Sequence, residues 1–402
     1  MDRNSMPEKL LQGARILDLS RMLTGGYGSM LLGDVGAEVI KIEPPDGGDP
    51  LRSMPPHFIE GESAYFLSIN RNKKSVTLDL RAEEGRKVFH ALVKNADVVF
   101  DNFRPGILEK LGADYETLKR INPGIICCSI LSFGRTGPYA NQPAFDLTIQ
   151  ALSGVMSYTG EPGRLPVRMG IPMGDLAGSM YAAFSISAAL YHREKTGEGR
   201  KIELSLLDCL IALHTYVAQY YFSGGEISGP IGSGHMSVVP YRAFATKDKP
   251  LVIAIFVEKF WKVLCEVIGD NEMGQNPKLA STAGRLANRA EVDERVQKKL
   301  LEKGREEWLA LLRKAEVPCA PILSIDEVFE DPQVVYDDMK MDIEHPKCGT
   351  IPTTGTPIKE TPKPAGPFAP PPLLGEHTEE VLIELAGLQK QDIEKLRAKK
   401  II

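Results

Sequence analysis

The sequence lacks the features that mark secreted and membrane-bound proteins. Its six cysteines form no C-x-x-C pair and no disulfide-dense spacing, which favours a reducing compartment. No apolar run approaches the roughly 20 residues that a membrane-spanning helix needs. The opening residues, MDRNSMPEKLLQG, have neither the apolar core nor the cleavage site of a signal peptide. We therefore expect a cytoplasmic protein without a membrane partner.

A surplus of positive charge is also absent. The 402 residues carry 48 Lys and Arg against 53 Asp and Glu, a net charge of −5 with both signs interspersed. This balance gives no reason to expect a nucleic-acid partner. The histidines, among them His192, His214 and His377, show no ligand-like spacing, so we expect no metal site. With 43% hydrophobic and 25% charged residues, the chain has the composition of an ordinary globular protein with two or three domains.

The first half of the chain alternates apolar strands with amphipathic helices. From Ala14 to about Thr196 the segments ARILDL, EVIKIE, DVVFDN and GIICCSIL read as strands, and AEEGRKVFHALVKNA reads as a helix between two of them. This alternation predicts an α/β fold, with a Rossmann-like parallel sheet flanked by helices.

Composition divides the remainder of the chain. A Gly- and Ser-rich stretch, FSGGEISGPIGSGH, separates the α/β part from YRAFATKDKPLVIAIF, which reads as a hairpin followed by helices and a last strand, VPCAPIL. The segment HPKCGTIPTTGTPIKETPKPAGPFAPPPLLG is so rich in Pro and Thr that we expect it to be largely extended. The expected organisation is a large α/β domain over 1–222, a Gly-rich flap over 223–239, a small α+β domain over 240–330, a Pro-rich linker over 331–372 and terminal helices over 373–402.

A glycine-rich turn follows the first expected strand, in LTGGYGSMLLGDVGAEVIKIE. Gly26 and Gly28 begin a dinucleotide fingerprint, but Leu31 stands where its third glycine belongs. The backbone N–H groups there could face an anion. Alternatively, Gly25 and Gly26 only let the chain turn and pack closely.

Asp175 stands before a long stretch of small and apolar residues, DLAGSMYAAFSISAALYHR. Their spacing predicts a buried helix from about Leu176 to Arg193, with Asp175 as its N-cap. Aspartate is a common N-cap, so a purely structural role is one interpretation. The other is a nucleophile that stays ionised at the positive end of the helix, where Gly174 and other small neighbours leave room for a substrate.

Eight segments, in order along nearly the whole chain, resemble one family. They include NRNKKSVTLDLRAEEGRKV, ADVVFDNFRPGILEKLG, FGRTGPYANQPAFDLTIQALSG, MGDLAGSMYA, TGEGRKIELSLLD and PLLGEHTEEVL. The chain thereby resembles the class III CoA-transferases, which include formyl-CoA transferase and carnitine CoA-transferase.

The resemblance implies transfer of CoA from an acyl-CoA to a free carboxylic acid. The family's nucleophilic aspartate matches Asp175, which would form a mixed anhydride and then an aspartyl-CoA thioester. No tightly bound cofactor is implied, since the CoA thioester is a substrate. In formyl-CoA transferase a glutamine of the first loop helps to bind the oxyanion, and Leu23 occupies the matching position. We therefore expect backbone N–H groups around Leu23 and Thr24 to serve as donors.

The resemblance also implies the residues that bind CoA. Two short segments, DNFRPG with the lysine after it and NRNKKS, match the family's CoA-binding pattern; they supply Asn102, Phe103, Arg104, Lys110, Asn72, Lys73 and Lys74. Basic side chains suit the phosphates of CoA. Without the resemblance, a solvated surface loop would explain the same charges.

Two rival functions share the fold. A racemase branch of the same fold uses a histidine where this chain has Phe145, and an aromatic hydrocarbon cannot move a proton, so we rank racemisation lower. Asp146 would then make only local hydrogen bonds. A CoA-binding protein without catalysis is the second rival. The intact GDLAGS around Asp175 argues against it.

The resemblance extends to substrate access and assembly. The Gly-rich flap would exclude water, and His235 within it would either contact substrate or lie on the surface. Arg164 or Arg168 would bind the second carboxylate of a dicarboxylic acid, or be plain surface charges. Family members are interlocked homodimers, so the terminal helices are expected to return to the large domain.

Overall fold

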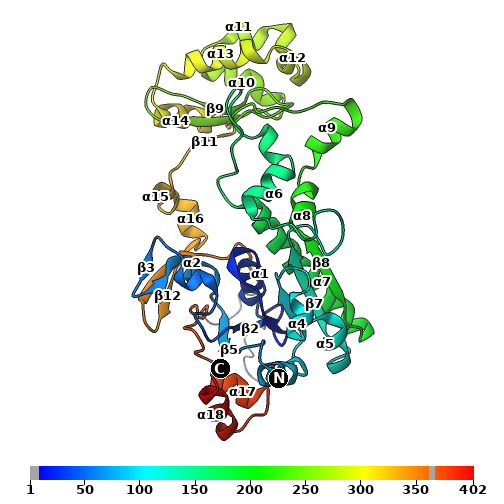
Figure 1. Ribbon diagram of the computed structural model, residues 1–402. Coiled ribbons are helices and arrows are strands. Elements are labelled where there is room, and N and C mark those ends of the chain that lie inside the picture. Colours follow the sequence, from blue (N-terminus) through cyan, green and yellow to red (C-terminus); the bar gives the residue numbers. More distant parts are fainter. Residues whose placement is uncertain (1–8, 362–366) are drawn as a thin grey trace, which may run out of the picture. The chain divides into compact units, whose positions relative to one another are not determined.

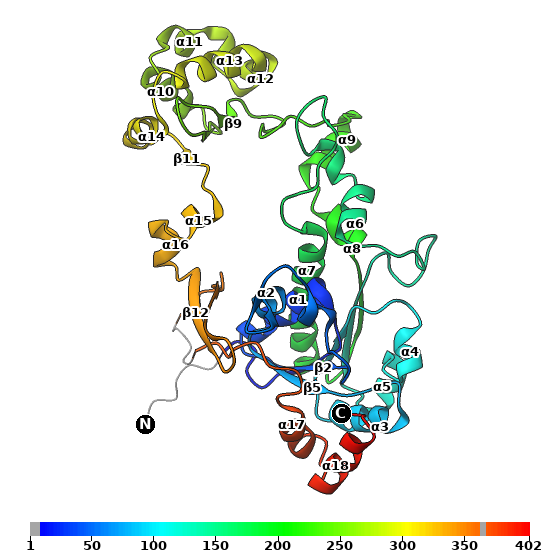
Figure 2. The same ribbon diagram turned by 60° about the vertical axis from the view of Figure 1, so that its left-hand side comes forward.

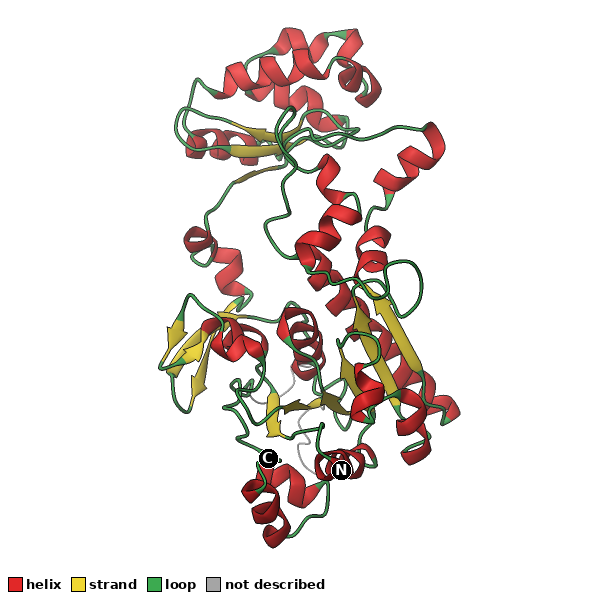
Figure 3. Ribbon diagram, viewed as in Figure 1, coloured by secondary structure: helices red, strands yellow, loops and turns green. Residues whose placement is uncertain are grey.

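The computed structural model of the chain describes residues 9–361 and 367–402 (Figures 1 and 3). The chain forms two compact units. The first takes its residues from Met1–Ser153, Gly170–His214 and Val335–Ile402, and the second from Gly154–Met169 and Thr215–Val334. Residues 154–169 lie in the range expected for the first domain but group with the second unit, where Gly232 N donates to Gly160 O at 2.8 Å.

The first unit is built on a six-stranded sheet of order β5-β2-β1-β6-β7-β8, in which all neighbouring strands are parallel. Its strands are β1 (Arg15–Asp18), β2 (Glu38–Glu43), β5 (Lys73–Thr77), β6 (Val98–Asp101), β7 (Ile126–Leu131) and β8 (Lys201–Ser205). Strands β6 and β7 are buried at every position, which explains their nearly continuous apolar sequences. The predicted α/β fold with a parallel sheet is confirmed.

Helices connect and cover these strands. They are α1 (Met22–Asp34), α2 (Ala64–Ile69), α3 (Glu83–Val93), α4 (Ile107–Leu111), α5 (Tyr115–Ile121), α6 (Asp146–Leu152), α7 (Met173–Thr196) and α8 (Leu206–Ala212), with 3-10 turns at Pro50–Ser53 and Val155–Tyr158. The terminal helices α17 (Thr378–Glu384) and α18 (Lys390–Ala398) contribute Val381, Leu382 and Ile393 to the core beneath β2 and β5. The C-terminal segment therefore completes the first unit (Figure 2).

The Pro-rich segment contains more regular structure than expected. Strands β12 (Lys340–His345) and β13 (Gly349–Thr354) form an antiparallel hairpin, and α16 (Pro332–Tyr336) precedes it. Ile343 and Ile351 pair across the hairpin and are buried beside Leu67. The burial of these two isoleucines stabilises the hairpin. The high content of Pro and Thr in this segment gave no indication of these strands. A second small hairpin joins β3 (Phe58–Ile59) to β4 (Glu62–Ser63).

The second unit has an antiparallel sheet of order β11-β10-β9. Its elements are α9 (Tyr216–Gly224), β9 (Tyr241–Phe244), β10 (Leu251–Ala254), α10 (Lys259–Val267), α11 (Asn271–Gln275), a 3-10 turn (Pro277–Leu279), α12 (Thr282–Ala287), α13 (Arg289–Leu300), α14 (Arg305–Lys314), β11 (Cys319–Pro321) and α15 (Ile325–Val328). Trp261 and Trp308 are buried in its core with the apolar residues of β9 and β10. The expected hairpin, helices and last strand are confirmed.

Within the described ranges, the search for a helix with the length and apolar character of a membrane span found none. All six cysteines are free thiols.

Candidate active site

The predicted nucleophile lies where two helices of the first unit begin. Helix α1 follows β1 after a short turn, and α7 packs along α1 in both views (Figures 1 and 2). Glycines permit this close approach. A Cβ on Gly178 would lie 2.4 Å from Leu206 Cδ2 and 3.4 Å from Thr24 Cγ2. The small residues after Asp175 therefore bring the first turn of α7 against the first turn of α1.

Asp175 is the third residue of α7, and the predicted N-cap role is wrong. The helix begins at Met173 with Pro172 as its N-cap residue and ends at Thr196. A side chain from another segment does the capping, because Asp146 Oδ1 accepts hydrogen bonds from Gly174 N at 2.8 Å and Asp175 N at 3.3 Å. The carboxylate of Asp175 is therefore not needed to cap its own helix.

This arrangement also corrects the expected role of Asp146. The sequence suggested only local hydrogen bonds, and one is present, from Gln150 Nε2 to Asp146 Oδ2 at 2.7 Å. The bonds to Gly174 and Asp175, however, connect the start of α6 to the start of α7. No sequence spacing indicates such a contact between residues so far apart in the chain.

Thr24 contacts the candidate nucleophile through its side chain. Its Oγ1 donates a hydrogen bond to Asp175 Oδ1 at 2.7 Å. Ser179 Oγ lies 2.6 Å from Thr24 O and 2.8 Å from Asp175 O, so one hydroxyl bridges the backbones of α1 and α7. The family resemblance predicts a role for the backbone around Thr24 and gives no indication of this side-chain contact. Leu23 is buried beside it in the first turn of α1, where N–H groups have no acceptor within the helix.

Burial dominates the electrostatics of Asp175. It raises the pKa of the carboxyl group to about 6; the Thr24 hydrogen bond lowers the pKa, and the charge of Asp146 raises it further. The carboxyl group is therefore a weaker acid than an exposed aspartate, because burial disfavours its charged form. At neutral pH the group is still mainly ionised and is more basic than an exposed aspartate.

Tyr65 on α2 is a further residue near this site that the sequence analysis missed. Burial raises the pKa of its phenol, and the charges of Asp175 and Asp146 add to the effect. The side chain remains 38% exposed. A lone tyrosine in GESAYFLSI gives no signal of this proximity.

The segment DNFRPG follows β6 and reaches the same edge of the sheet. Asn102 bonds to the backbone of Arg21, just before α1, and the Arg21 guanidinium lies 5.3 Å from the ring centroid of Phe103. Arg104 and Lys110 are exposed. The structure thus brings Asn102 and Phe103 to the start of α1 and leaves the two basic side chains in solvent.

The segment NRNKKS has partners of its own within the first unit. Asn72 Oδ1 accepts from Ala369 N at 2.8 Å, and Lys74 Nζ lies 2.7 Å from Glu380 Oε1. The ammonium of Lys73 is fully buried and donates to Gly26 O at 2.8 Å; burial lowers the pKa of Lys73 to about 7. The predicted contacts with CoA phosphates stay predictions, and Lys73 is the least accessible of the three.

The Gly-rich segment of the second unit is held in place by several contacts. His235 stacks on Tyr216 with ring centroids 5.5 Å apart, and Arg289 Nη2 donates to His235 O at 2.8 Å. Burial and the charge of Arg289 lower the pKa of His235. Arg164 and Arg168 are exposed in the same unit. Their predicted roles toward a substrate stay predictions.

Comparison with known proteins identifies the family of the chain. A family model described as CoA-transferase family III matches residues 11–378. Succinyl-CoA:glutarate CoA-transferase from Mus musculus is 38% identical, covering 98% of this chain and 90% of that protein. Succinate–glutarate CoA-transferase from Agrobacterium fabrum is 36% identical, covering 94% and 96%. The crystal structure of a CaiB/BaiF family protein from Brucella suis has a TM-score of 0.84 at 36% identity, covering 94% of this chain and all of that one.

Proposed function

The chain belongs to CoA-transferase family III and is a CoA-transferase, and from this premise we propose that it transfers CoA to a free carboxylic acid through covalent intermediates on Asp175. One observation carries the proposal: a partly buried carboxylate whose own helix needs no cap from it is held by Thr24 Oγ1 at 2.7 Å. An aspartate with only a capping role would accept hydrogen bonds from the N–H groups of its own helix end. Here Asp146 accepts them, and the carboxylate of Asp175 remains available to react.

The proposed reaction proceeds by four exchanges at acyl carbon. A carboxylate oxygen of Asp175 attacks the thioester carbonyl, and CoA thiolate leaves, which gives a mixed anhydride. The thiolate then attacks the aspartyl carbon and releases the donor as a free acid, leaving an aspartyl-CoA thioester. The acceptor carboxylate attacks this thioester and expels the thiolate again, which forms a second anhydride. The thiolate finally attacks the acceptor carbonyl, and Asp175 is regenerated.

The surroundings of Asp175 suit these steps. A pKa of about 6 leaves the group ionised at neutral pH while raising its basicity above that of an exposed carboxylate. Each tetrahedral intermediate carries an oxyanion, and the N–H groups of Leu23 and Thr24 in the first turn of α1 are the proposed donors.

We propose that CoA lies along residues carried over from the family, namely Phe103, Arg104, Lys110, Asn72, Lys73 and Lys74. The exposed cations Arg104 and Lys110 are the most accessible to phosphates. Both relatives named above have titles that include succinate or succinyl-CoA together with glutarate. These names support the proposal that donor and acceptor are dicarboxylates.

Two rival functions are weaker. Racemisation needs a second base where this chain has Phe145, whose side chain is a hydrocarbon and is 76% exposed. A CoA-binding protein without catalysis gives no reason for a buried carboxylate of raised pKa beside Thr24, because an uncompensated buried charge weakens the fold.

The direct test is to trap the intermediate. We expect brief exposure to succinyl-CoA followed by borohydride or hydroxylamine to modify Asp175, seen by peptide mass spectrometry. The Asp175→Ala variant should lose both the modification and the transfer activity. Asp392→Ala is the matched control, since the Asp392 side chain is 48% exposed and Asp392 is also the third residue of a helix, α18. Full transfer activity in Asp175→Ala would overturn the proposal.

The acceptor class has its own test. With succinyl-CoA as donor, we expect kcat/KM for glutarate to exceed that for butyrate by roughly tenfold or more, because an unpaired polar group in the site penalises an acid that lacks the second carboxylate. Equal values for the two acids would show that the second carboxylate is not recognised.

A further inference from the structure

Side chains from several segments hold the turn between β1 and α1. Five backbone groups over three consecutive residues, Ser20 to Met22, each bond to a side chain. Asp18 Oδ1 accepts from Ser20 N at 2.9 Å, Lys41 Nζ donates to Ser20 O at 2.8 Å, Asn102 bonds to both Arg21 N and Arg21 O, and Asp49 Oδ1 accepts from Met22 N at 3.2 Å. The holding side chains come from the ends of β1 and β6, from β2 and from the chain beyond it.

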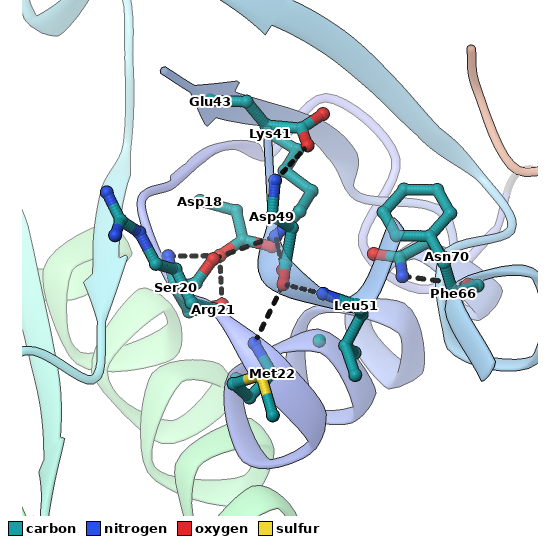
Figure 4. A network of polar contacts seen from close by, with 12 residues as sticks. Asp18, Ser20, Arg21, Met22, Lys41, Glu43, Asp49, Leu51, Phe66 and Asn70 are labelled. Atoms are coloured by element: carbon teal, nitrogen blue, oxygen red, sulfur yellow. Dashed lines mark hydrogen bonds and ion pairs between the residues drawn. The ribbon is translucent and has the colours of Figure 1, made fainter. Parts of the chain in front are cut away.

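Two of these side chains form a buried ion pair. Lys41 Nζ lies 2.9 Å from Asp49 Oδ2, and both side chains are almost fully buried. Figure 4 shows the Asp49 carboxylate between Lys41 and the amide nitrogens of Met22 and Leu51. A buried pair with these additional hydrogen bonds favours one geometry, because a shift of either ion costs contacts that water cannot replace.

The turn is strained where it enters α1. Met22 has φ = 61°, in the left-handed region that residues other than Gly rarely adopt. Gly25 packs against the same turn so closely that an added Cβ would lie 2.0 Å from Ser20 Cβ. Such a conformation persists only where the surrounding structure over-determines it, and it is common beside active sites.

Asn102 bonds to both backbone groups of one residue of the turn. Its Oδ1 accepts from Arg21 N at 2.9 Å and its Nδ2 donates to Arg21 O at 2.7 Å, so both polar atoms of one amide bond to the backbone of one residue. The pairing of β1 with β6 explains why Asn102 reaches this turn. β1 and β6 are parallel neighbours with Asp18 opposite Phe100, so both chains leave the sheet at the same edge. A residue directly after β6 therefore reaches the turn after β1.

We propose that Asn102 is a positioning residue: it fixes the Arg21 backbone so that Thr24, three residues on, holds Asp175 in the orientation needed for attack. The inference rests on the proposed nucleophilic role of Asp175. It changes the role carried over from the family, in which Asn102 lies along CoA. Thr24 Oγ1 lies 2.7 Å from Asp175 Oδ1, and a shift of the turn by about 1 Å would break that bond and is the size of displacement that costs catalysis heavily.

Asn102→Ala separates the two roles. A positioning residue predicts that kcat falls roughly 10- to 100-fold, while KM for the acyl-CoA and the Kd of free CoA stay within about twofold. Arg104→Ala is the contrasting variant, because an exposed phosphate contact should raise KM and the Kd of CoA and leave kcat nearly unchanged. Circular dichroism and a urea unfolding curve confirm that each variant is folded.

A double-mutant cycle tests whether Asn102 acts through Thr24. Thr24→Val removes the hydroxyl at nearly constant size, and Thr24→Ser keeps it. If the loss in kcat passes through Thr24, Asn102→Ala combined with Thr24→Val should be no slower than Thr24→Val alone, and Thr24→Ser should restore most of the activity. The acid limb of the kcat/KM profile should also move to higher pH in Thr24→Val and Asn102→Ala, since the hydrogen bond lowers the pKa of Asp175.

Three results would overturn the inference: a raised KM with unchanged kcat in Asn102→Ala, independent effects in the cycle, or wild-type kcat in Thr24→Val. Should Asn102→Ala fail to fold, Thr24→Val and Thr24→Ser still test the inference. Wild-type kcat in Thr24→Val would show that the reaction does not need the hydrogen bond that the turn is proposed to hold in place. Failure of the proposed function would look different, since Asp175→Ala would then remain active.

Discussion

At the residue scale, Asp175 is a charged group in a place that disfavours its charge. Burial raises its pKa from 3.8 to about 6, so the folded chain binds more protons than the unfolded chain between these pH values. The ionised form therefore weakens the fold, and this cost is fully present above about pH 6 and absent below about pH 4. A nucleophile that lowers stability is expected where activity and stability compete.

Asp175→Asn should accordingly stabilise the protein at neutral pH. Because the side chain is partly exposed, we expect the free energy of unfolding to rise by at most about 2 kcal/mol at pH 8, and the gain to vanish near pH 4. Urea unfolding at the two pH values measures the difference. A gain of equal size at both pH values, or no gain at pH 8, would contradict the proposed cost of the buried charge.

Asp146→Asn tests the charge on the neighbouring residue. Asparagine keeps an oxygen that can accept from Gly174 N and Asp175 N, but removes the negative charge that raises the pKa of Asp175. The acid limb of kcat/KM should therefore move to lower pH. Asp208→Asn on α8 is the control and should leave the limb in place. An unchanged or higher limb in Asp146→Asn would show that its charge does not reach the nucleophile.

At the scale of elements, the site depends on the close approach of the turn before α1 to the helix itself. Gly25 lies in the first turn of α1, and the absence of a side chain lets Ser20 pack directly on it. The strain at Met22 is tolerated only while this packing and the bonds from Asp49 and Asn102 persist.

Gly25→Ala should disrupt this arrangement. An added Cβ would lie 2.0 Å from Ser20 Cβ, so the turn must move. We expect a loss of unfolding free energy of roughly 1–3 kcal/mol, as for other overpacked sites, together with a large fall in kcat. Gly224→Ala at the end of α9 is the matched control, because nothing lies within 4 Å of an added Cβ there. Wild-type stability and activity in Gly25→Ala would show that the turn is not tightly packed.

At the scale of the whole molecule, both units expose large apolar side chains. On α9, Tyr216, Tyr221 and Phe222 are 44, 56 and 74% exposed, and no residue of that helix is buried. On α7, Phe184 is 72% exposed. Apolar surface of this kind marks an interaction site when it is contiguous. We therefore propose a homodimer, in line with the assembly that the family resemblance implies.

Light scattering after size exclusion tests the assembly. We expect a mass of twice the 44.2 kDa chain and a shift toward the monomer in Phe222→Asp, because a charge in an apolar interface is costly. Leu301→Asp is the control: this leucine is 50% exposed but stands among charged residues after α13. A wild-type chain that elutes as a monomer at micromolar concentration would contradict the proposal.

The sequence by itself determined the fold class and the order of elements, because apolar period and turn residues are local signals. Apolar runs such as ICCSIL and VVFD predict a parallel sheet, and the small residues after Asp175 indicate a closely packed helix. The candidate nucleophile also came from the sequence, through family motifs that surround it.

Only the tertiary structure decided how the site is held together. Asp146 caps the helix that carries Asp175, Thr24 binds the carboxylate itself, and Asn102 closes on Arg21. Each contact joins segments that lie far apart in the chain, and no spacing rule relates them. Whether a buried acid keeps an ordinary pKa depends likewise on the water and charges that packing removes or brings near. Those are properties of the assembled fold.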